Sequence, residues 1–182
     1  MCISNSQLDE HILKRDLIAV SRQSLESNKL QGFPLAYSPD LLLVRYVYDF
    51  HLDGLLLIRR KDISYVHCRE TDRFQRKLLE TENRIKRGLF RRDYSVESFT
   101  SFLQRINHKQ IVVIENETPG VDDFFIGRHI NSDKDTVTIH EFSGAGNWER
   151  DMTKIPIDTI TCCQIETNYI NFYSRHFDRA SQ

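Results

Sequence analysis

The feature that most constrains the fold is an alternation of apolar and polar residues that runs through positions 123–165. Phe124, Ile126 and Ile130 would all lie on one face of a strand, with polar residues between them. A period of two residues, carried by β-branched and aromatic side chains, is typical of half-buried antiparallel strands. Asp133-Lys134-Asp135 supplies a turn after this strand. The stretch therefore predicts consecutive antiparallel strands.

Similar patterns predict strands over much of the remaining chain. Asp53-Gly54 is the strongest hairpin signal, because both residues adopt positive φ readily. The segment 169–177 is interpreted either as a last strand or as a docked tail. The predicted strands cover residues 16–23, 30–37, 41–52, 55–60, 63–68, 110–115, 124–131, 136–143 and 159–166, with a short strand near Ile155.

Three segments change to a helical period instead. A short helix is predicted over 6–14 and a longer one over 70–87, which Gly88 would end. In the longer helix, an apolar stripe is expected to face the core, and a third helix is expected to begin at a Ser95 cap. The stripe consists of Phe74, Leu78 and Ile85, helped by Leu79, and the inner face of the third helix consists of Val96, Phe99, Leu103 and Ile106.

The two halves of the chain align with each other. When Gly32 is placed on Gly127, 95 positions later, turns and apolar positions recur in register, and Ile58 meets Ile155 once two extra residues are allowed. Each half then reads as a helix followed by five short strands. We therefore predict an internal duplication, with one unit over 1–92 and a second over 93–182, and helices where they join.

This order of elements resembles the Sm-like and wider SH3-like small β-barrels, and Gly127 stands where Sm-like domains carry the glycine of their second strand. The resemblance implies a mainly β, α+β fold of two such units. The short RNA-contacting motifs of that family are not recognisable here. The run YDFHLDGLLLIRRKDIS and the later FFIGR and YINFYS segments also resemble an uncharacterised bacterial protein family, for which we know no activity.

Composition narrows the functional classes. The net charge is −1, so no overall field draws the chain to nucleic acid or to membranes. No apolar run reaches the roughly 18 residues of a membrane span, and the first 17 residues carry charges throughout. The cysteines form no CxxC motif, and adjacent Cys162 and Cys163 would point to opposite faces of a strand. We expect a cytoplasmic protein with reduced thiols, no cofactor and no membrane contact.

One segment, 69–92, has nine basic and four acidic residues, an excess that the rest of the chain does not share. Such a segment could contact phosphates, or it could be a solvated helix face with internal ion pairs. Aromatic residues for base stacking are scarce in it. The candidate nucleic-acid-binding residues are Arg73, Arg76, Lys77, Arg84, Lys86 and Arg87.

A second candidate site is the loop around Trp148, the only tryptophan. Gly144, Gly146 and Asn147 precede it, and an aromatic residue on such a loop either binds a ligand or closes the barrel mouth as part of the core. His129 and His140 would face each other across a hairpin, but two imidazoles are too few for a zinc site. No catalytic motif and no metal-ligand set is found.

These observations favour a non-enzymatic binding or assembly module that contacts a protein partner or a second copy of itself, since small barrels bind through strand edges and loops. Two alternatives are nucleic-acid binding, specifically RNA, through residues 69–92, and small-ligand regulation at the Trp148 loop.

Overall fold

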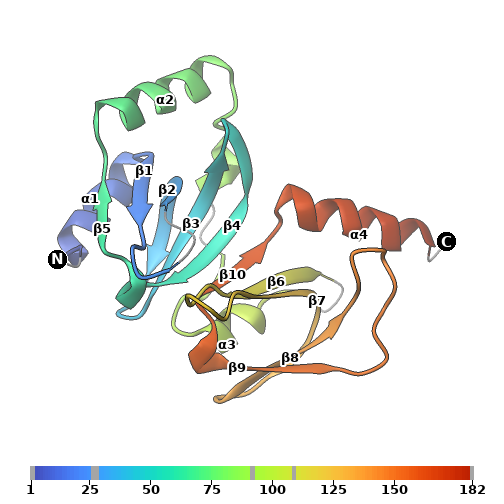
Figure 1. The fold of residues 1–182 in the computed structure, drawn as a ribbon. Coiled ribbons are helices and arrows are strands. Elements are labelled where there is room, and N and C mark those ends of the chain that lie inside the picture. The colour runs from blue at the N-terminus through green and yellow to red at the C-terminus, as the bar shows by residue number, and fades with distance from the viewer. Residues whose placement is uncertain (1–2, 26–28, 91–92, 108–109, 181–182) are drawn as a thin grey trace.

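A computed structural model describes residues 3–25, 29–90, 93–107 and 110–180 (Figure 1). It confirms a mainly β fold with several helices. The strands are β1 (Ile18–Ser21), β2 (Lys29–Tyr37), β3 (Leu41–Tyr48), β4 (His51–Arg59), β5 (Tyr65–His67), β6 (Ile111–Asn116), β7 (Asp123–Ser132), β8 (Thr136–Glu141), β9 (Thr153–Pro156) and β10 (Cys162–Ile165). The α-helices are α1 (Asn5–Lys14), α2 (Glu70–Thr81), α3 (Phe99–Leu103) and α4 (Asn168–Ala180), and the 3₁₀ turns are η1 (Arg60–Asp62), η2 (Arg87–Phe90) and η3 (Ile157–Thr159).

The described strands form one ten-stranded sheet in the order β5-β1-β2-β3-β4-β10-β6-β7-β8-β9. Every neighbouring pair is antiparallel. Figure 1 shows the sheet bent into two lobes, one built from β1–β5 below α2 and the other from β6–β10 beside α4. The lobes are joined where β4 pairs with β10, from Ile58 opposite Cys162 to Leu55 opposite Ile165. After β9, the short turn η3 leads the chain back into β10, which lies between β4 and β6 and makes the sheet continuous.

The pairing register of the N-terminal half recurs in the C-terminal half. Every residue pair between β7 and β8 lies 95 positions after a pair between β2 and β3, including the irregularity next to Pro34 and its counterpart next to His129. Pairs between β8 and β9 repeat those between β3 and β4 in the same way, with a shift of 97 for the second strand. Gly32 and Gly127 occupy corresponding positions, opposite Tyr46 and Glu141.

Alternation along β3 and β4 places leucines on both faces of the sheet, and each face has its own core. One face and α1 form the first core, which contains Leu8, Leu42, Val44, Leu56 and Ile58. The other face packs with the C-terminal half to form the second core, which contains Leu35, Leu41, Leu43, Leu55, Leu57, Phe99, Phe102, Leu103, Val137, Ile139 and Ile155. Both faces of β4 are therefore buried, as in a strand at the centre of a larger fold.

The prediction of a turn at Asp53-Gly54 is wrong. Tyr48 pairs with His51, so the turn consists of Asp49 and Phe50, which have φ values of 44° and 60°. Asp53 and Gly54 lie inside β4, where the register shifts. Gly54 does adopt a positive φ, +87°, as a turn would require, but it does so within a strand.

The expected pairing of His129 with His140 is also wrong by one residue. The register shifts between His129 and Asn131, so His129 pairs with Ile139 and Arg128 pairs with His140. His129 is buried, and His140 Nε2 donates a hydrogen bond to the Glu149 carbonyl oxygen at 2.8 Å. The two imidazoles therefore do not form a pair on the exterior of the hairpin.

Two helical predictions need correction. The segment 169–177 is the helix α4 rather than a strand, because Ile170, Tyr173 and Phe177 recur with helical spacing and pack into one apolar cluster. The helix α3 begins after Ser98, whose side chain accepts a hydrogen bond from the Ser101 amide, and not at Ser95. Its predicted inner face is confirmed at Phe99 and Leu103, which are buried. Ile106 is also buried but lies beyond the end of the helix, and half-buried Val96 lies before its start.

We predict that Gly54→Ala destabilises the protein by about 2 kcal/mol or more. A Cβ at this position would lie 2.4 Å from the carbonyl oxygen of Ile165, so the residue allows β10 to approach β4. Gly144→Ala is the matched control, because a Cβ there meets no atom within 4 Å. Urea unfolding of both variants measures the difference. Equal stability of the two variants would contradict this account of the joint.

Candidate functional site

The basic segment does not form the single long helix that was expected. α2 ends at Thr81, and Asn83 has a φ of 52°, so the chain turns before Arg84. The candidate cations therefore fall into two groups, one on the helix and one on the segment that follows it. The side chain of Arg87 lies outside the described part of the structure, so its predicted role stays a prediction.

Two of the helical cations have partners within the protein. Arg76 contacts Asp16 at 3.5 Å and Glu80 at 3.0 Å, and it donates to the Lys14 carbonyl oxygen at 3.0 Å. Arg73 donates to the Cys68 carbonyl oxygen at 2.8 Å. Across the described residues, no ion pair is found for the other candidates, Lys77, Arg84 and Lys86. These three remain available to a ligand.

The face of α2 that points inward is not the predicted stripe. Asp72 is buried, accepts from the Arg69 amide at 2.7 Å and lies 3.1 Å from His67 Nδ1, which fixes the rotation of the helix. Leu79, seven residues later, shares this inward face and is buried. Phe74 and Leu78 consequently point outward, where they are 59% and 37% exposed.

The exposed side chains of α2 continue onto the tip of the β3–β4 hairpin. Phe50, which is 43% exposed, lines a hollow of about 280 Å³ together with Leu78 and Arg84. Its φ of 60° is uncommon for a bulky residue and raises the energy of the turn. We call Phe50, Phe74 and Leu78 the α2 surface. It combines exposed apolar area with a concave site, which is typical of protein-binding surfaces.

The Trp148 loop is held against α4. The Trp148 ring lies 4.5 Å from that of Phe177 and 5.3 Å from that of Phe142, and the Arg128 guanidinium stacks on it at 4.6 Å, distances measured to ring centroids. Sequence reasoning left a ligand site and a core lid open, and this packing supports the lid. Trp148 is half-buried within the cluster formed by these rings.

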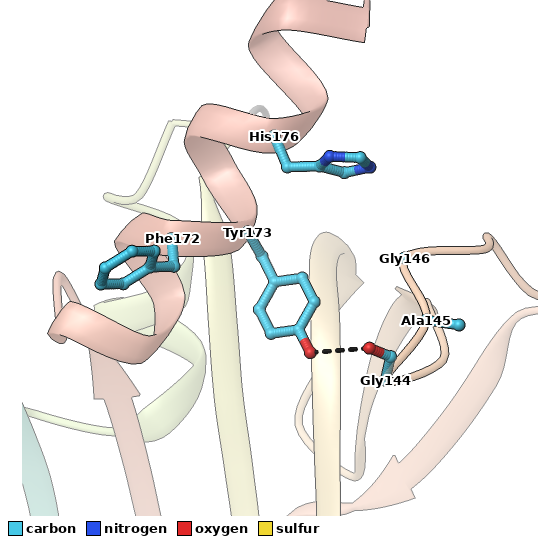
Figure 2. Close-up of a pocket in the computed structure, with 6 residues that line it drawn as sticks. All are labelled: Gly144, Ala145, Gly146, Phe172, Tyr173 and His176. Atoms are coloured by element: carbon cyan, nitrogen blue, oxygen red, sulfur yellow. Dashed lines mark hydrogen bonds between the residues drawn. The ribbon is translucent and has the colours of Figure 1, made fainter.

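A hollow of about 210 Å³ lies beside the same loop (Figure 2). Tyr173 points across it and donates a hydrogen bond to the Gly144 carbonyl oxygen at 3.0 Å, and His176 lies above Gly146. Gly144 and Gly146 line this hollow, but Asn147 and Trp148 do not. The structure thus divides the predicted ligand loop between a hollow and a packed aromatic cluster.

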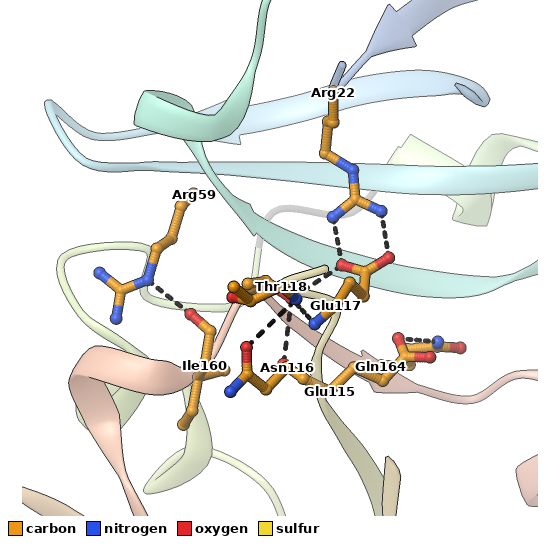
Figure 3. Close-up of polar contacts among 9 residues, drawn as sticks. Arg22, Arg59, Glu115, Asn116, Glu117, Thr118, Ile160 and Gln164 are labelled. Carbon is orange, nitrogen blue, oxygen red and sulfur yellow. Dashed lines mark hydrogen bonds and ion pairs between the residues drawn. The ribbon is translucent and has the colours of Figure 1, made fainter. Parts of the chain in front are cut away.

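A buried polar network at the junction of the halves was not found from the sequence (Figure 3). Arg22 is 1% exposed and forms two hydrogen bonds of 2.5 Å with the carboxylate of Glu117. Thr161 donates to the same carboxylate at 2.8 Å, and Gln164 donates to Glu115 at 2.5 Å. Arg22 and Glu117 are 95 positions apart in the sequence. The only sequence signal for this pair is that each charged residue follows an apolar strand.

Burial at this junction raises the pKa values of two side chains. Burial raises the pKa of the Glu115 carboxyl, and the nearby Glu117 carboxylate adds to the effect. Burial also raises the pKa of the Cys162 thiol well above its usual value. Ligand atoms of Glu115, Glu117 and Cys162 lie within 4.8 Å of one another. However, Arg22 and Gln164 already bind the carboxylates and the thiol is protonated, so the group suits a closed polar network better than a metal site.

The cysteines of the described residues are free thiols. Cys162 lies in the first core and Cys163 in the second, which confirms that neighbours in this strand point to opposite faces. Cys2 lies outside the described residues. Burial raises the pKa of Cys163 as well, so neither adjacent thiol is suited to act as a nucleophile.

We predict that Glu117→Leu destabilises the protein by about 3–5 kcal/mol, because it leaves the Arg22 guanidinium buried without its partner. The double variant Arg22→Met/Glu117→Leu should recover most of this loss, since replacing both members of a buried pair with apolar residues is often neutral. Chemical unfolding of the wild type and the two variants provides the comparison. A double variant as unstable as Glu117→Leu would contradict this explanation, because removing the unpaired guanidinium would then recover no stability.

A second prediction concerns pH. A carboxyl whose pKa is raised by folding stabilises the protein at low pH, and this contribution is lost as pH rises past its unfolded value toward its folded value. We therefore expect Glu115→Gln to increase the free energy of unfolding at pH 7, the increase to shrink as pH falls through the raised folded pKa toward the ordinary value of 4.5, and no increase to remain below that value. Unfolding titrations at several pH values test this. A constant difference across the range would assign the effect to something other than the ionisation of Glu115.

No helix among the described residues is both long and apolar enough to cross a membrane. Comparison of the chain with models of protein families, with curated proteins and with solved structures finds no match in any of the three. The case for function therefore rests on the geometry described above.

Proposed function

We propose that this chain is a non-enzymatic binding module and that a protein partner docks on the α2 surface. The observation that carries the proposal is the exposure of Phe74 and Leu78 on a helix whose rotation is fixed by buried Asp72. Grouped apolar side chains that remain exposed on a folded domain mark interaction surfaces more often than isolated ones do. The hollow between Phe50 and Leu78 is suited to an apolar side chain of the partner.

Backbone strain at the hairpin tip supports this proposal. Phe50 occupies a positive-φ turn position that Asn or Gly would fill at lower cost. The side chain is nevertheless partly exposed, so burial within the protein does not offset this cost in full. Phe50 therefore keeps a conformation of high energy beside an exposed apolar helix face. Contact between its ring and a partner would explain why an aromatic residue stands there.

We also propose that the fold consists of two Sm-like units in tandem, which arose by duplication. Support comes from the strand order, since β5-β1-β2-β3-β4 and β10-β6-β7-β8-β9 list equivalent strands in the same sequence. Further support comes from the constant shifts in pairing register and from the two glycines. A Cβ on Gly32 would lie 2.4 Å from the Arg45 carbonyl oxygen, and one on Gly127 would lie 2.2 Å from that of His140.

A second candidate function is nucleic-acid binding. The observation that favours it is that Lys77, Arg84 and Lys86 lack ion pairs within the described residues. Phosphate contacts by these cations would make binding strongly dependent on salt. The small-ligand alternative rests on the hollow beside Gly144 and Gly146, which is lined mostly by aromatic and backbone atoms.

The test is capture of partners by the tagged full-length chain from its source cells, with and without nuclease. Phe74→Ser/Leu78→Ser should reduce the captured protein at least about tenfold, because truncating interface anchors costs more than about 1 kcal/mol each. Leu13→Ser/Phe172→Ser is the matched control, since these residues are 84% and 69% exposed and lie outside the α2 surface. The control should capture as much as the wild type.

Two results would contradict the proposal. Equal capture by both variants would show that the partner does not bind the α2 surface. Capture that disappears with nuclease, and that is lost in Lys77→Gln/Arg84→Gln/Lys86→Gln, would place nucleic-acid binding first. In that case, the salt slope of binding to single-stranded nucleic acid should fall by about 2 in the triple variant.

A further inference from the structure

We infer that the joint between the two halves is a head-to-tail docking interface, and that polar residues at both outer ends prevent a second copy of the chain from docking in the same way. The inference rests on the tandem arrangement proposed above. It concerns the ends of the sheet and not the α2 surface. It predicts that the chain does not extend itself through its free edge strands, β5 and β9.

The joint has three components. β4 pairs with β10 over four residue pairs, and Leu55 and Leu57 pack in the core of the C-terminal half. Arg59 extends from the end of β4 and donates to the Ile160 carbonyl oxygen at 2.5 Å and to that of Ile157. Its guanidinium also stacks on Phe99 of α3, 5.2 Å from the ring centroid. These contacts show what an outer β3–β4 face needs in order to accept the next unit.

The equivalent face of the C-terminal half lacks the central apolar pair. Thr138 pairs with Lys154 between β8 and β9, where the N-terminal half has Leu43 paired with Leu57. Both leucines are fully buried, whereas Lys154 is exposed and Thr138 is half-buried. A unit docked there in the same register would have to bury an unpaired ammonium group, which costs several kcal/mol.

The edge strand itself is altered as well. Pro156 occupies the position of Arg59, opposite Thr136 in the place of Leu41. Proline provides neither the guanidinium that holds the joint nor a backbone N–H for a neighbouring strand. Lysine and proline together on an edge strand are a common protection against pairing with another chain.

At the other end of the sheet, α1 has polar residues where α3 has apolar residues in the joint. Ser4 and Ser98 are the N-caps of α1 and α3, 94 positions apart, and both form capping boxes. The residue after each cap is exposed Asn5 in α1 and buried Phe99 in α3. Five positions after the cap, exposed Asp9 stands in α1 where buried Leu103 stands in α3. The face of α3 that enters the joint is thus polar in α1.

Some apolar side chains do remain at the C-terminal end. Ile130 and Met152 are exposed close to β8 and β9. Neither residue removes the obstacle, because the Thr138–Lys154 pair and Pro156 lie on the strands that would have to form the contact. Repeat proteins end in units with polar outer faces for the same reason, since an uncovered apolar face would recruit further copies.

The experiment places apolar residues on one outer end of each of two full-length chains. One chain carries Thr138→Leu/Lys154→Leu, and the other carries Asn5→Phe/Asp9→Leu. Each retains one polar end, so a mixture of the two should form a 1:1 complex that cannot extend, as expected for a heterologous interface. Light scattering should show that the wild type has the mass of a single chain. The average mass of the mixture should approach twice that value as concentration rises.

The matched control is Lys14→Leu/Thr118→Leu, mixed with the same Asn5→Phe/Asp9→Leu chain. It makes the same chemical change at two exposed residues that lie outside β8 and β9, and its mixture should keep the mass of one chain. If the leucine variant at β8–β9 does not fold, which circular dichroism would show, Thr138→Val/Lys154→Val is mixed in its place and should give the same complex.

Three results would overturn the inference: a mixture of folded variants that forms no complex, a control that forms one equally well, or a wild type that assembles through β5 and β9. None of the substituted residues belongs to the α2 surface. Partner capture in the preceding test is therefore unaffected by this outcome, and the two proposals can fail separately.

Discussion

The antiparallel pairing of β4 with β10 is the contact on which the rest of the structure depends. It is the point at which strands of the N-terminal and C-terminal halves share hydrogen bonds, and it turns two five-stranded sets into one sheet. Leu55, Leu56, Leu57 and Ile58 are buried on both faces there, so the two cores meet at a single strand. Gly54 allows the approach, and Arg59 closes one end of the joint.

The buried pair of Arg22 and Glu117 lies at the same junction, and it favours one arrangement of the halves. Such a pair adds little net stability, because the cost of removing two charges from water offsets their attraction. Its value here lies in the penalty for a wrong arrangement, which would leave either charge buried alone. The bidentate geometry and the additional bond from Thr161 mean that few alternative placements satisfy the same groups.

Much of the fold could be predicted from local patterns. Alternation identified most strands, and the alignment of Gly32 with Gly127 anticipated the register that β2–β3 and β7–β8 share. The failures have specific physical causes. Asp53-Gly54 resembles a turn because a bulge and a turn require the same positive φ, and α4 contains the aromatic residues that also favour strands.

The candidate sites were harder to predict than the strands. Apolar spacing on α2 indicated that Phe74 and Leu78 would be buried, but a charged residue, Asp72, sets the rotation of the helix through contacts with Arg69 and His67. That choice depends on residues brought together by folding, which helical periodicity does not contain. For the same reason, the Arg22–Glu117 pair could not be predicted from residues 95 positions apart.

Hydrogen exchange at two equivalent amides tests the central claim most directly. Leu57 and Lys154 occupy matching positions in β4 and β9, but only Leu57 has a neighbouring strand on both sides. Because the Ile157 amide donates toward β8 and amides alternate along a strand, the Lys154 amide points to the open side. The account predicts that, in exchange followed by NMR, the Leu57 amide exchanges only through large-scale unfolding and the Lys154 amide exchanges rapidly. Equal, strong protection of both amides would show that β9 is covered as β4 is, and would contradict the account.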